Sequence, residues 1–318
     1  MTGIIMRGLK QGLSVTWTLG KVIFPVTLIV TILRFTPVLP WAMEKIAPFM
    51  AWLGLSGEAA VPLVLGNFLN LYAGIAAILS FDFTVKEVFI LAVMLSFSHN
   101  LLIESTVASR VGVSWWFVIG FRLSLAVISA AVINLVWKGG NEMAVYGLAP
   151  KQEAAPDGWG EIMLQGLQTA AMGILQLALI VIPLMVFMQY LREKGWLDIF
   201  SGWVAPATKF LGMNRNTSMT LVAGLTIGLA YGAGMMIQAV KEDGVSRKDM
   251  YLAMIFLVSC HAVVEDTLIF IPLGIPVWPL LAFRLITAIL LTAAIGFIWN
   301  RLEKNREEHI HEHKYNTL

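Results

Sequence analysis

The 318-residue chain has a single cysteine, Cys260, and only 13% of its residues are charged. One cysteine excludes an intrachain disulfide. The net charge of +2, without any basic cluster, argues against nucleic-acid binding, because phosphate recognition needs grouped Lys and Arg. No nucleotide-binding loop, no Ser/His/Asp arrangement and no four-ligand zinc spacing occurs. The sequence therefore predicts no enzyme activity, no cofactor and no nucleic-acid partner.

Long polar stretches are also scarce. Hydrophobic residues make up 58% of the chain, and several apolar runs reach the ~20 residues that cross a bilayer. The longest internal polar stretch, 138–161, contains Gly139-Gly140 and two prolines and is predicted to be a linker. No small-residue cleavage site follows the first residues, so the first apolar segment is expected to be a retained anchor. These features predict a multi-pass protein of a bacterial inner membrane.

The chain contains an internal duplication, in which two copies of one membrane unit follow each other. Pro25 and Pro183 correspond at an offset of 158 residues, and His99 and His261 correspond at an offset of 162. The shared positions also include Gly66/Gly224, Lys86/Lys248, Gly112/Gly274, Arg122/Arg284 and Trp137/Trp299. Glu104 corresponds to Asp266, so the acid is kept in kind. Duplicated hydrophobic halves are typical of secondary transporters.

The duplication predicts the organisation of the chain. We expect an N-terminal cytoplasmic or interfacial segment (1–20), a first repeat (21–137), the linker (138–161), a second repeat (162–300) and a charged tail (301–318). The predicted fold class is an all-α integral membrane protein with two inverted repeats. Each repeat is expected to hold transmembrane helices, one interfacial helix and a re-entrant helical hairpin formed by a glycine-rich segment. Counting Lys and Arg on each side favours the hairpin over a full crossing of that segment.

Ionisable residues at membrane depth are candidates for function. Glu104 and Arg122 lie about equally far from the turn at Gly112, so a helical hairpin places them at the same height. Asp266 and Arg284 repeat this arrangement. We expect two intramembrane ion pairs, Glu104–Arg122 and Asp266–Arg284. They could act as structural staples, or an acid could exchange between its arginine and a substrate or proton.

Two histidines lie near the middle of equivalent spans. His99 is followed by Asn100, and His261 is preceded by Cys260. A lone histidine in an apolar helix is more often a packing residue. These two histidines occupy equivalent positions in both halves, which favours a role in a functional site. Glu265, four residues after His261, is expected to share its helical face. Because Ile103 stands at the equivalent position, Glu265 is not needed to build the repeat, and we predict that it is a coupling or substrate-binding acid.

The glycine-rich segments, 58–80 and 216–240, also carry polar residues. Asn67 and Asn216 are candidate substrate contacts if the segments are broken and expose backbone groups. The alternative is that the small residues serve close helix packing alone.

The run Leu53–Leu63, LGLSGEAAVPL, resembles the nucleoside-recognition, or gate, domain family. The resemblance covers about residues 20–137 and extends to the copy at 173–299. Gate domains occur in concentrative nucleoside transporters, ferrous iron transporters and spore maturation proteins. The resemblance implies re-entrant hairpins, inverted repeats and a substrate-holding glutamate in the first hairpin, which corresponds to Glu58. Asn216 stands at the matching position of the second half, and Cys260 does not match the gate cysteines of the iron transporters.

Three functions stay open at this point. The first is transport of a small polar solute, such as a nucleoside or related metabolite, by alternating access with proton coupling through His261 and Glu265. The second is divalent metal transport by His99, Cys260, His261 and Glu265, since imidazole, thiolate and carboxylate together suit transition metals. The charged tail carries three alternating histidines, His309, His311 and His313, which could add weak metal ligands or simply be solvated. The third is a non-transporting scaffold, in which the intramembrane polar residues are only staples. The expected partners are the lipid bilayer and a small solute or ion, with a homo-oligomer left open.

Overall fold

The protein is helical throughout the part that the computed structural model describes, which comprises residues 2–146, 158–229, 234, 236–238, 242 and 244–315. Within those residues there is no β-strand, only an isolated bridge between Thr84 and Met143. In this described part of the chain, five helical segments are long and apolar enough to cross a membrane: 3–34, 85–110, 115–136, 159–191 and 277–305. These observations confirm the predicted all-α, multi-pass membrane fold.

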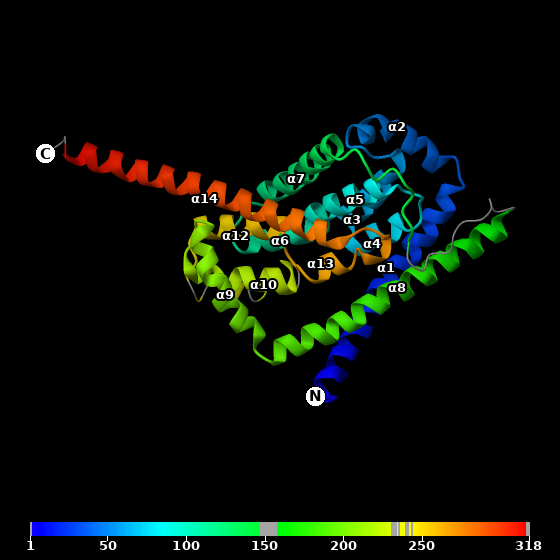
Figure 1. The fold of residues 1–318 in the computed structure, drawn as a ribbon, viewed down its shortest axis with the longest axis horizontal. Coiled ribbons are helices and arrows are strands. Elements are labelled where there is room, and N and C mark those ends of the chain that lie inside the picture. The colour runs from blue at the N-terminus through cyan, green and yellow to red at the C-terminus, as the bar shows by residue number, and fades with distance from the viewer. Residues whose placement is uncertain are drawn as a thin grey trace.

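Two long helices pack against each other along one side of the molecule. α1 (Thr2–Arg34) and α8 (Trp159–Glu193) cross below the other helices (Figure 1). Glycines allow the close approach: a Cβ on Gly8 would lie 2.6 Å from the Cα of Val186, and one on Gly12 would lie 2.9 Å from the Cα of Ile182. Close packing through small residues is the usual way in which membrane helices associate.

Gly8→Ala is expected to lower the midpoint of thermal unfolding, because its methyl group meets backbone that can yield only if the two helices separate. Overpacking of this kind costs about 1–3 kcal/mol. Gly173→Ala, on α8, is the matched control, since nothing lies within 4 Å of the added Cβ. There the methyl group should leave stability unchanged or raise it slightly. Tryptophan fluorescence of the purified proteins would measure the unfolding midpoints of the two variants. Equal midpoints for Gly8→Ala and Gly173→Ala would contradict the packing argument.

The first repeat contains a short helical hairpin. α2 (Val38–Trp52) leads through a 3-10 turn (Gly57–Ala59) into α3 (Ala60–Phe68) and then α4 (Leu71–Ile78). Asn70 caps α4, its side chain accepting a hydrogen bond from the backbone N–H of Ala73 at 2.9 Å. Gly66 and Gly74 face each other, because a Cβ on Gly74 would lie 3.1 Å from the Cα of Gly66. α2 and the segment 57–68 meet at a bend of 95°.

The second repeat follows the same order as far as it is described. α9 (Trp196–Phe210) is followed by a 3-10 turn (Arg215–Thr217) and α10 (Ser218–Ile227). Most of the chain from residue 230 to 243, including Tyr231 and Gly232 of the glycine-rich segment, lies outside the described residues. The second arm of the predicted second hairpin therefore stays a prediction.

Polar side chains fasten equivalent turns in the two halves. In the first, Thr84 and Glu87 form a capping box at the start of α5 (Val85–Ser98), and Glu87 accepts a hydrogen bond from the N–H of Ser56 at 2.8 Å. In the second, Ser246 caps α12 (Arg247–Ser259), and Asp249 accepts from the N–H of Asn214 at 3.3 Å. The duplication seen in the sequence thus extends to individual hydrogen bonds. The inverted orientation of the repeats stays a prediction.

Some boundaries differ from those expected. α1 runs from Thr2 to Arg34 without a break at position 20, and α14 (Val277–Tyr315) continues beyond position 300 and projects away from the other helices (Figure 1). Although α1 contains several glycines and Pro25, both helices are continuous, so their polar ends extend the helices of the apolar spans.

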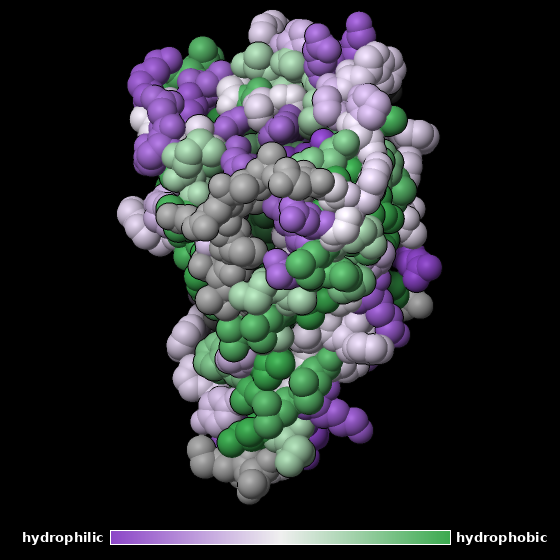
Figure 2. All heavy atoms as spheres, turned by 90° about the vertical axis from the view of Figure 1, so that its right-hand side faces the viewer, coloured by the Kyte–Doolittle hydropathy of each residue, from purple (hydrophilic) through white to green (hydrophobic). Residues whose placement is uncertain are grey.

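The apolar surface marks the lipid-facing side. Large hydrophobic side chains are exposed along the long helices, among them Leu135, Val136, Leu179, Leu290 and Phe297. On one face of the molecule, hydrophobic side chains gather around the middle and hydrophilic ones toward the top (Figure 2). Such a large exposed apolar surface fits contact with a bilayer.

Candidate functional site

Both polar-centred spans are interrupted at their histidines. α5 ends at Ser98, His99 leaves the helical conformation, Asn100 adopts a left-handed φ of 49°, and α6 (Leu101–Arg110) begins after it. In the second half, α12 ends at Ser259 and Ala262 adopts a φ of 40°. A positive φ is uncommon in an alanine and costs of order 1 kcal/mol or more, so the surrounding structure must enforce it.

The two breaks are anchored in the same way. The N–H of Asn100 donates to the carbonyl oxygen of Gly66 at 3.0 Å, and the N–H of Ala262 donates to that of Gly224 at 3.0 Å. The expectation that His261 and Glu265 share one helical face is wrong, because His261 lies in the break and Glu265 begins the new helix α13 (Glu265–Leu268). A four-residue spacing carries information about facing only within an unbroken helix.

Two fully buried arginines satisfy the carbonyl groups that the breaks release. In the first half, Arg122, on α7 (Trp115–Val136), donates from Nε to the carbonyl of Phe97 and from Nη2 to that of His99, both at 2.6 Å. Its Nη2 also lies 2.8 Å from Glu104 Oε2. This is the Glu104–Arg122 pair that the sequence predicts.

The second half repeats the arrangement with longer distances. Arg284 Nη2 donates to the carbonyl of His261 at 2.8 Å and lies 3.4 Å from Asp266 Oδ2. Its Nη1 also donates to Thr267 Oγ1 at 3.3 Å. Each guanidinium therefore ties a broken helix to an acid just beyond the break.

The two histidines meet where the halves join. Their ring centroids are 5.1 Å apart, and both side chains are almost completely buried. His99 Nδ1 lies 2.6 Å from the carbonyl oxygen of Leu95, and His261 Nδ1 lies 2.8 Å from that of Leu257. Because a carbonyl oxygen can only accept, each Nδ1 carries the proton and donates it, which leaves both Nε2 atoms aimed at the centre.

Carboxylates from both halves face these Nε2 atoms. Glu104 Oε1 lies 3.5 Å from His99 Nε2 and 3.4 Å from His261 Nε2. Asp266 Oδ2 lies 3.9 Å from His99 Nε2 and 3.4 Å from His261 Nε2. Each acid therefore contacts the histidine of its own half and that of the other half.

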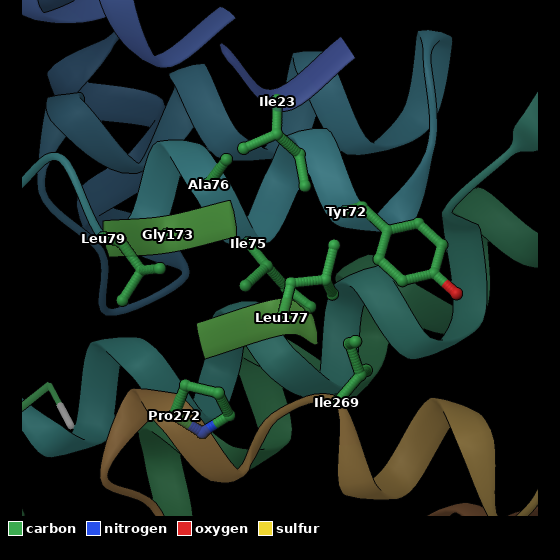
Figure 3. Close-up of a pocket in the computed structure, with 9 residues that line it drawn as sticks. All are labelled: Ile23, Tyr72, Ile75, Ala76, Leu79, Gly173, Leu177, Ile269 and Pro272. Atoms are coloured by element: carbon green, nitrogen blue, oxygen red, sulfur yellow. The ribbon is translucent and has the colours of Figure 1, made fainter. Parts of the chain in front are cut away.

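Glu265 is bound by the other half as well. The hydroxyl of Tyr72, on α4, donates a short hydrogen bond to Glu265 Oε1. Figure 3 shows the Tyr72 ring at the edge of an apolar contact that includes Ile75 and Leu177, with its hydroxyl turned away from those side chains. The tyrosine thus has one apolar side against α8 and one polar end at the acid.

A cavity of about 310 Å³ joins these groups. It lies beside both helix breaks and is bordered by α1 and α4. Its polar lining consists of Thr18, Asn70, Tyr72, His99, Asn100, Glu104, His261, Glu265 and Asp266. This volume is near the lower end of those of small-molecule sites, which combine apolar walls with a few convergent polar groups.

Four residues predicted to bind a substrate or a metal do not line the cavity. Glu58 lies in the 3-10 turn before α3, and Asn216 is exposed in the matching turn of the second half. Asn67 donates to the carbonyl of Leu63 within its own helix at 2.7 Å. Cys260 is buried beside His261 but is not one of the residues whose ligand atoms converge. The structure therefore brings both histidines together with Glu104, Glu265 and Asp266. The substrate contacts predicted in the glycine-rich segments lie outside the cavity.

Sequence reasoning did not select Tyr72, Asn70 or Thr18 as site residues. Tyr72 and Asn70 belong to a glycine-rich segment for which the sequence allows either a re-entrant hairpin or a full crossing, and Thr18 lies in the segment predicted to be cytoplasmic or interfacial. A polar residue in an apolar run is a signal, but only the tertiary structure shows which of these residues reach the cavity.

Comparisons with known proteins agree with this architecture. The family model for nucleoside recognition, called Gate, matches residues 16–113 and 174–276, once in each half. The membrane protein YvoD of Bacillus subtilis (strain 168), described as uncharacterized, is 62% identical over 301 residues, which cover 95% of this chain and 96% of that protein. No solved structure matches the chain significantly. The chain therefore belongs to the Gate family of nucleoside-recognition membrane proteins.

Proposed function

We propose that the protein transports a small polar solute, of the nucleoside or related metabolite class, across a bacterial inner membrane. The observation that carries this proposal is the central cavity, which is lined by ionisable residues of both halves. Burying such groups in a membrane protein is costly, and they are usually retained along a transport path. A scaffold would need the ion pairs but not a cavity bordered by both histidines.

The break in each span supports alternating access. Transporters that use inverted repeats place discontinuous helices at the substrate site near the bilayer midplane. Here the breaks at Asn100 and Ala262 adjoin the cavity, and the contacts at the centre join the two halves. We propose that the halves are inverted and that they rock against each other around the histidine pair.

Glu265 is proposed as the substrate-binding and coupling acid. It lines the cavity, it has no counterpart in the first half, and its contact with Tyr72 joins α4 to α13. A carboxylate that binds a solute hydroxyl or a proton would release or rearrange the tyrosine contact. Substrate or proton binding could in this way loosen a contact between the halves.

Glu265→Gln is expected to lower solute uptake at least ~10-fold, because a hydrogen bond to a charged group contributes about 1.5–3 kcal/mol. A thermal-shift screen of the purified protein across nucleosides and amino acids would first identify a solute. Labelled uptake into proteoliposomes, with and without a pH gradient, would then be measured. The variant should also lose any stimulation by the gradient.

Glu193→Gln is the matched control, since it makes the same change at an exposed acid that pairs with Arg7 far from the cavity. It should transport like the wild-type protein. Unchanged uptake by Glu265→Gln would remove that acid from the mechanism. The failure of every solute to stabilise or cross would contradict the transport proposal itself.

A further inference from the structure

We infer that His99, His261 and Asp266 form a binding site for a divalent transition-metal cation of the zinc class. The three residues converge from both halves, and their ligand atoms all lie within 4.8 Å of one another. All three are buried, with 9% or less of each side chain exposed. The site adjoins the cavity but does not depend on the identity of any transported solute.

The histidine tautomers favour metal binding. Both Nδ1 atoms donate to backbone carbonyls of the preceding turn, so both Nε2 atoms can offer lone pairs to the centre. Metal-binding histidines in proteins almost always donate their second ring N–H to a carbonyl or carboxylate in this way. His261 Nε2 is buried, and no aligned hydrogen bond reaches it from the described residues.

The two distances from Asp266 to the imidazoles are close to those around a tetrahedral ion. Ligands at about 2.0–2.1 Å from zinc lie about 3.3 Å from one another. Asp266 Oδ2 lies 3.4 Å from His261 Nε2 and 3.9 Å from His99 Nε2. A contraction of the cluster, whose ligand atoms lie within 4.8 Å of one another, would therefore produce three protein ligands. The fourth position would go to Glu104 Oε1, which lies 3.5 Å and 3.4 Å from the two Nε2 atoms, or to an exchangeable ligand from the cavity.

The charges around the site also call for a cation. Glu104, Asp266 and Glu265 supply three carboxylates, whereas Arg122 and Arg284 supply two guanidinium groups. With neutral imidazoles, the Nε2 lone pairs face the carboxylate oxygens of Glu104 and Asp266 with no positive charge between them. Either a proton on Nε2 or a metal cation between the imidazoles and Asp266 would remove this repulsion, and the binding experiment below distinguishes the two. The arginines, meanwhile, hold both acids in place, as the outer partners of metal ligands do.

The test uses Co²⁺ as the probe on the full-length protein, purified without a histidine tag and stripped with a chelator. The wild-type protein is expected to bind one Co²⁺ per chain, measured by elemental analysis, with the optical absorption of tetrahedral cobalt. His99→Gln and His261→Gln should each weaken binding at least ~100-fold, since even the loss of an outer-shell partner costs 10–100-fold.

Two controls separate this site from other donors. Cys260→Ser removes the neighbouring buried thiol, and a triple substitution of His309, His311 and His313 by Ala removes the tail imidazoles; both proteins should bind Co²⁺ like the wild type. X-ray absorption of the cobalt-loaded wild-type protein should show two imidazoles around the ion. Because this measurement uses the wild-type protein, it does not depend on whether the variants fold. Absence of Co²⁺ binding, or binding that both histidine variants retain or that the tail substitution abolishes, would overturn the assignment. Because binding is measured without transport, it succeeds or fails independently of the proposed function.

Discussion

Arg122→Met should cause the largest loss of stability of any substitution considered, about 3–5 kcal/mol. Removing one partner of a buried ion pair leaves an uncompensated buried charge, and losses of this size are typical. Here the substitution strands the Glu104 carboxylate and removes the donor to the carbonyls of Phe97 and His99. We expect a much lower unfolding midpoint in detergent and little folded protein in the membrane.

The control is Arg7→Met, which breaks an exposed pair with Glu193. Exposed ion pairs contribute about 0–1 kcal/mol, so this variant should melt close to the wild-type protein. The double variant Arg122→Met/Glu104→Gln should recover part of the lost stability. It removes the unpaired Glu104 carboxylate but leaves the carbonyls of Phe97 and His99 without their donor. If Arg122→Met melts like Arg7→Met, the arginine is not the group that holds the helix break.

Gly66→Val should produce the second largest effect, because it disrupts both the hairpin and the break beside the histidine. A Cβ on Gly66 would lie 2.4 Å from Leu95 Cδ2, and Leu95 is fully buried. The valine would push α3 away from α4 and α5, at a cost of about 1–3 kcal/mol. It would also displace the Gly66 carbonyl from the N–H of Asn100 and leave that buried donor without its partner.

Unfolding midpoint and solute uptake should therefore both fall in Gly66→Val. Gly120→Val, on α7, is the matched control, since nothing lies within 4 Å of a Cβ at that position. It should keep both properties, because valine is no worse than glycine in a helix. Normal uptake by Gly66→Val would show that the hairpin can move away from the break without harm to the site.

Much of the architecture follows from patterns that the sequence displays directly. The hydrophobic runs predict the long helices because a bilayer imposes a length on any crossing segment. The paired offsets predict the repetition of the site, and the similar distances of Glu104 and Arg122 from the turn near Gly112-Val113 predict their contact. These inferences need only helix geometry and the cost of burying charge.

The breaks at His99 and His261 could not be read from the sequence in the same way. Asn100 tolerates a left-handed conformation, but Ala262 does not favour one, and it is held there by tertiary contacts such as the one with the Gly224 carbonyl. The prediction that His261 and Glu265 share one helical face assumes an unbroken helix, and it is wrong because the helix is interrupted between them. The contact between Tyr72 and Glu265 joins distant segments, and no local pattern encodes it.

The interrupted helices also have an electrostatic consequence. Each helix terminus carries about half an elementary charge, negative at its C-terminal end and positive at its N-terminal end. The guanidinium groups of Arg122 and Arg284 lie at the C-terminal ends of α5 and α12, while Glu104 and Asp266 lie in the first turns of α6 and α13. Arg122, Arg284 and Glu104 therefore lie at helix termini whose dipoles favour their sign, so that the backbone itself offsets part of the cost of dehydrating them. α13 is a single turn of four residues and contributes little at Asp266.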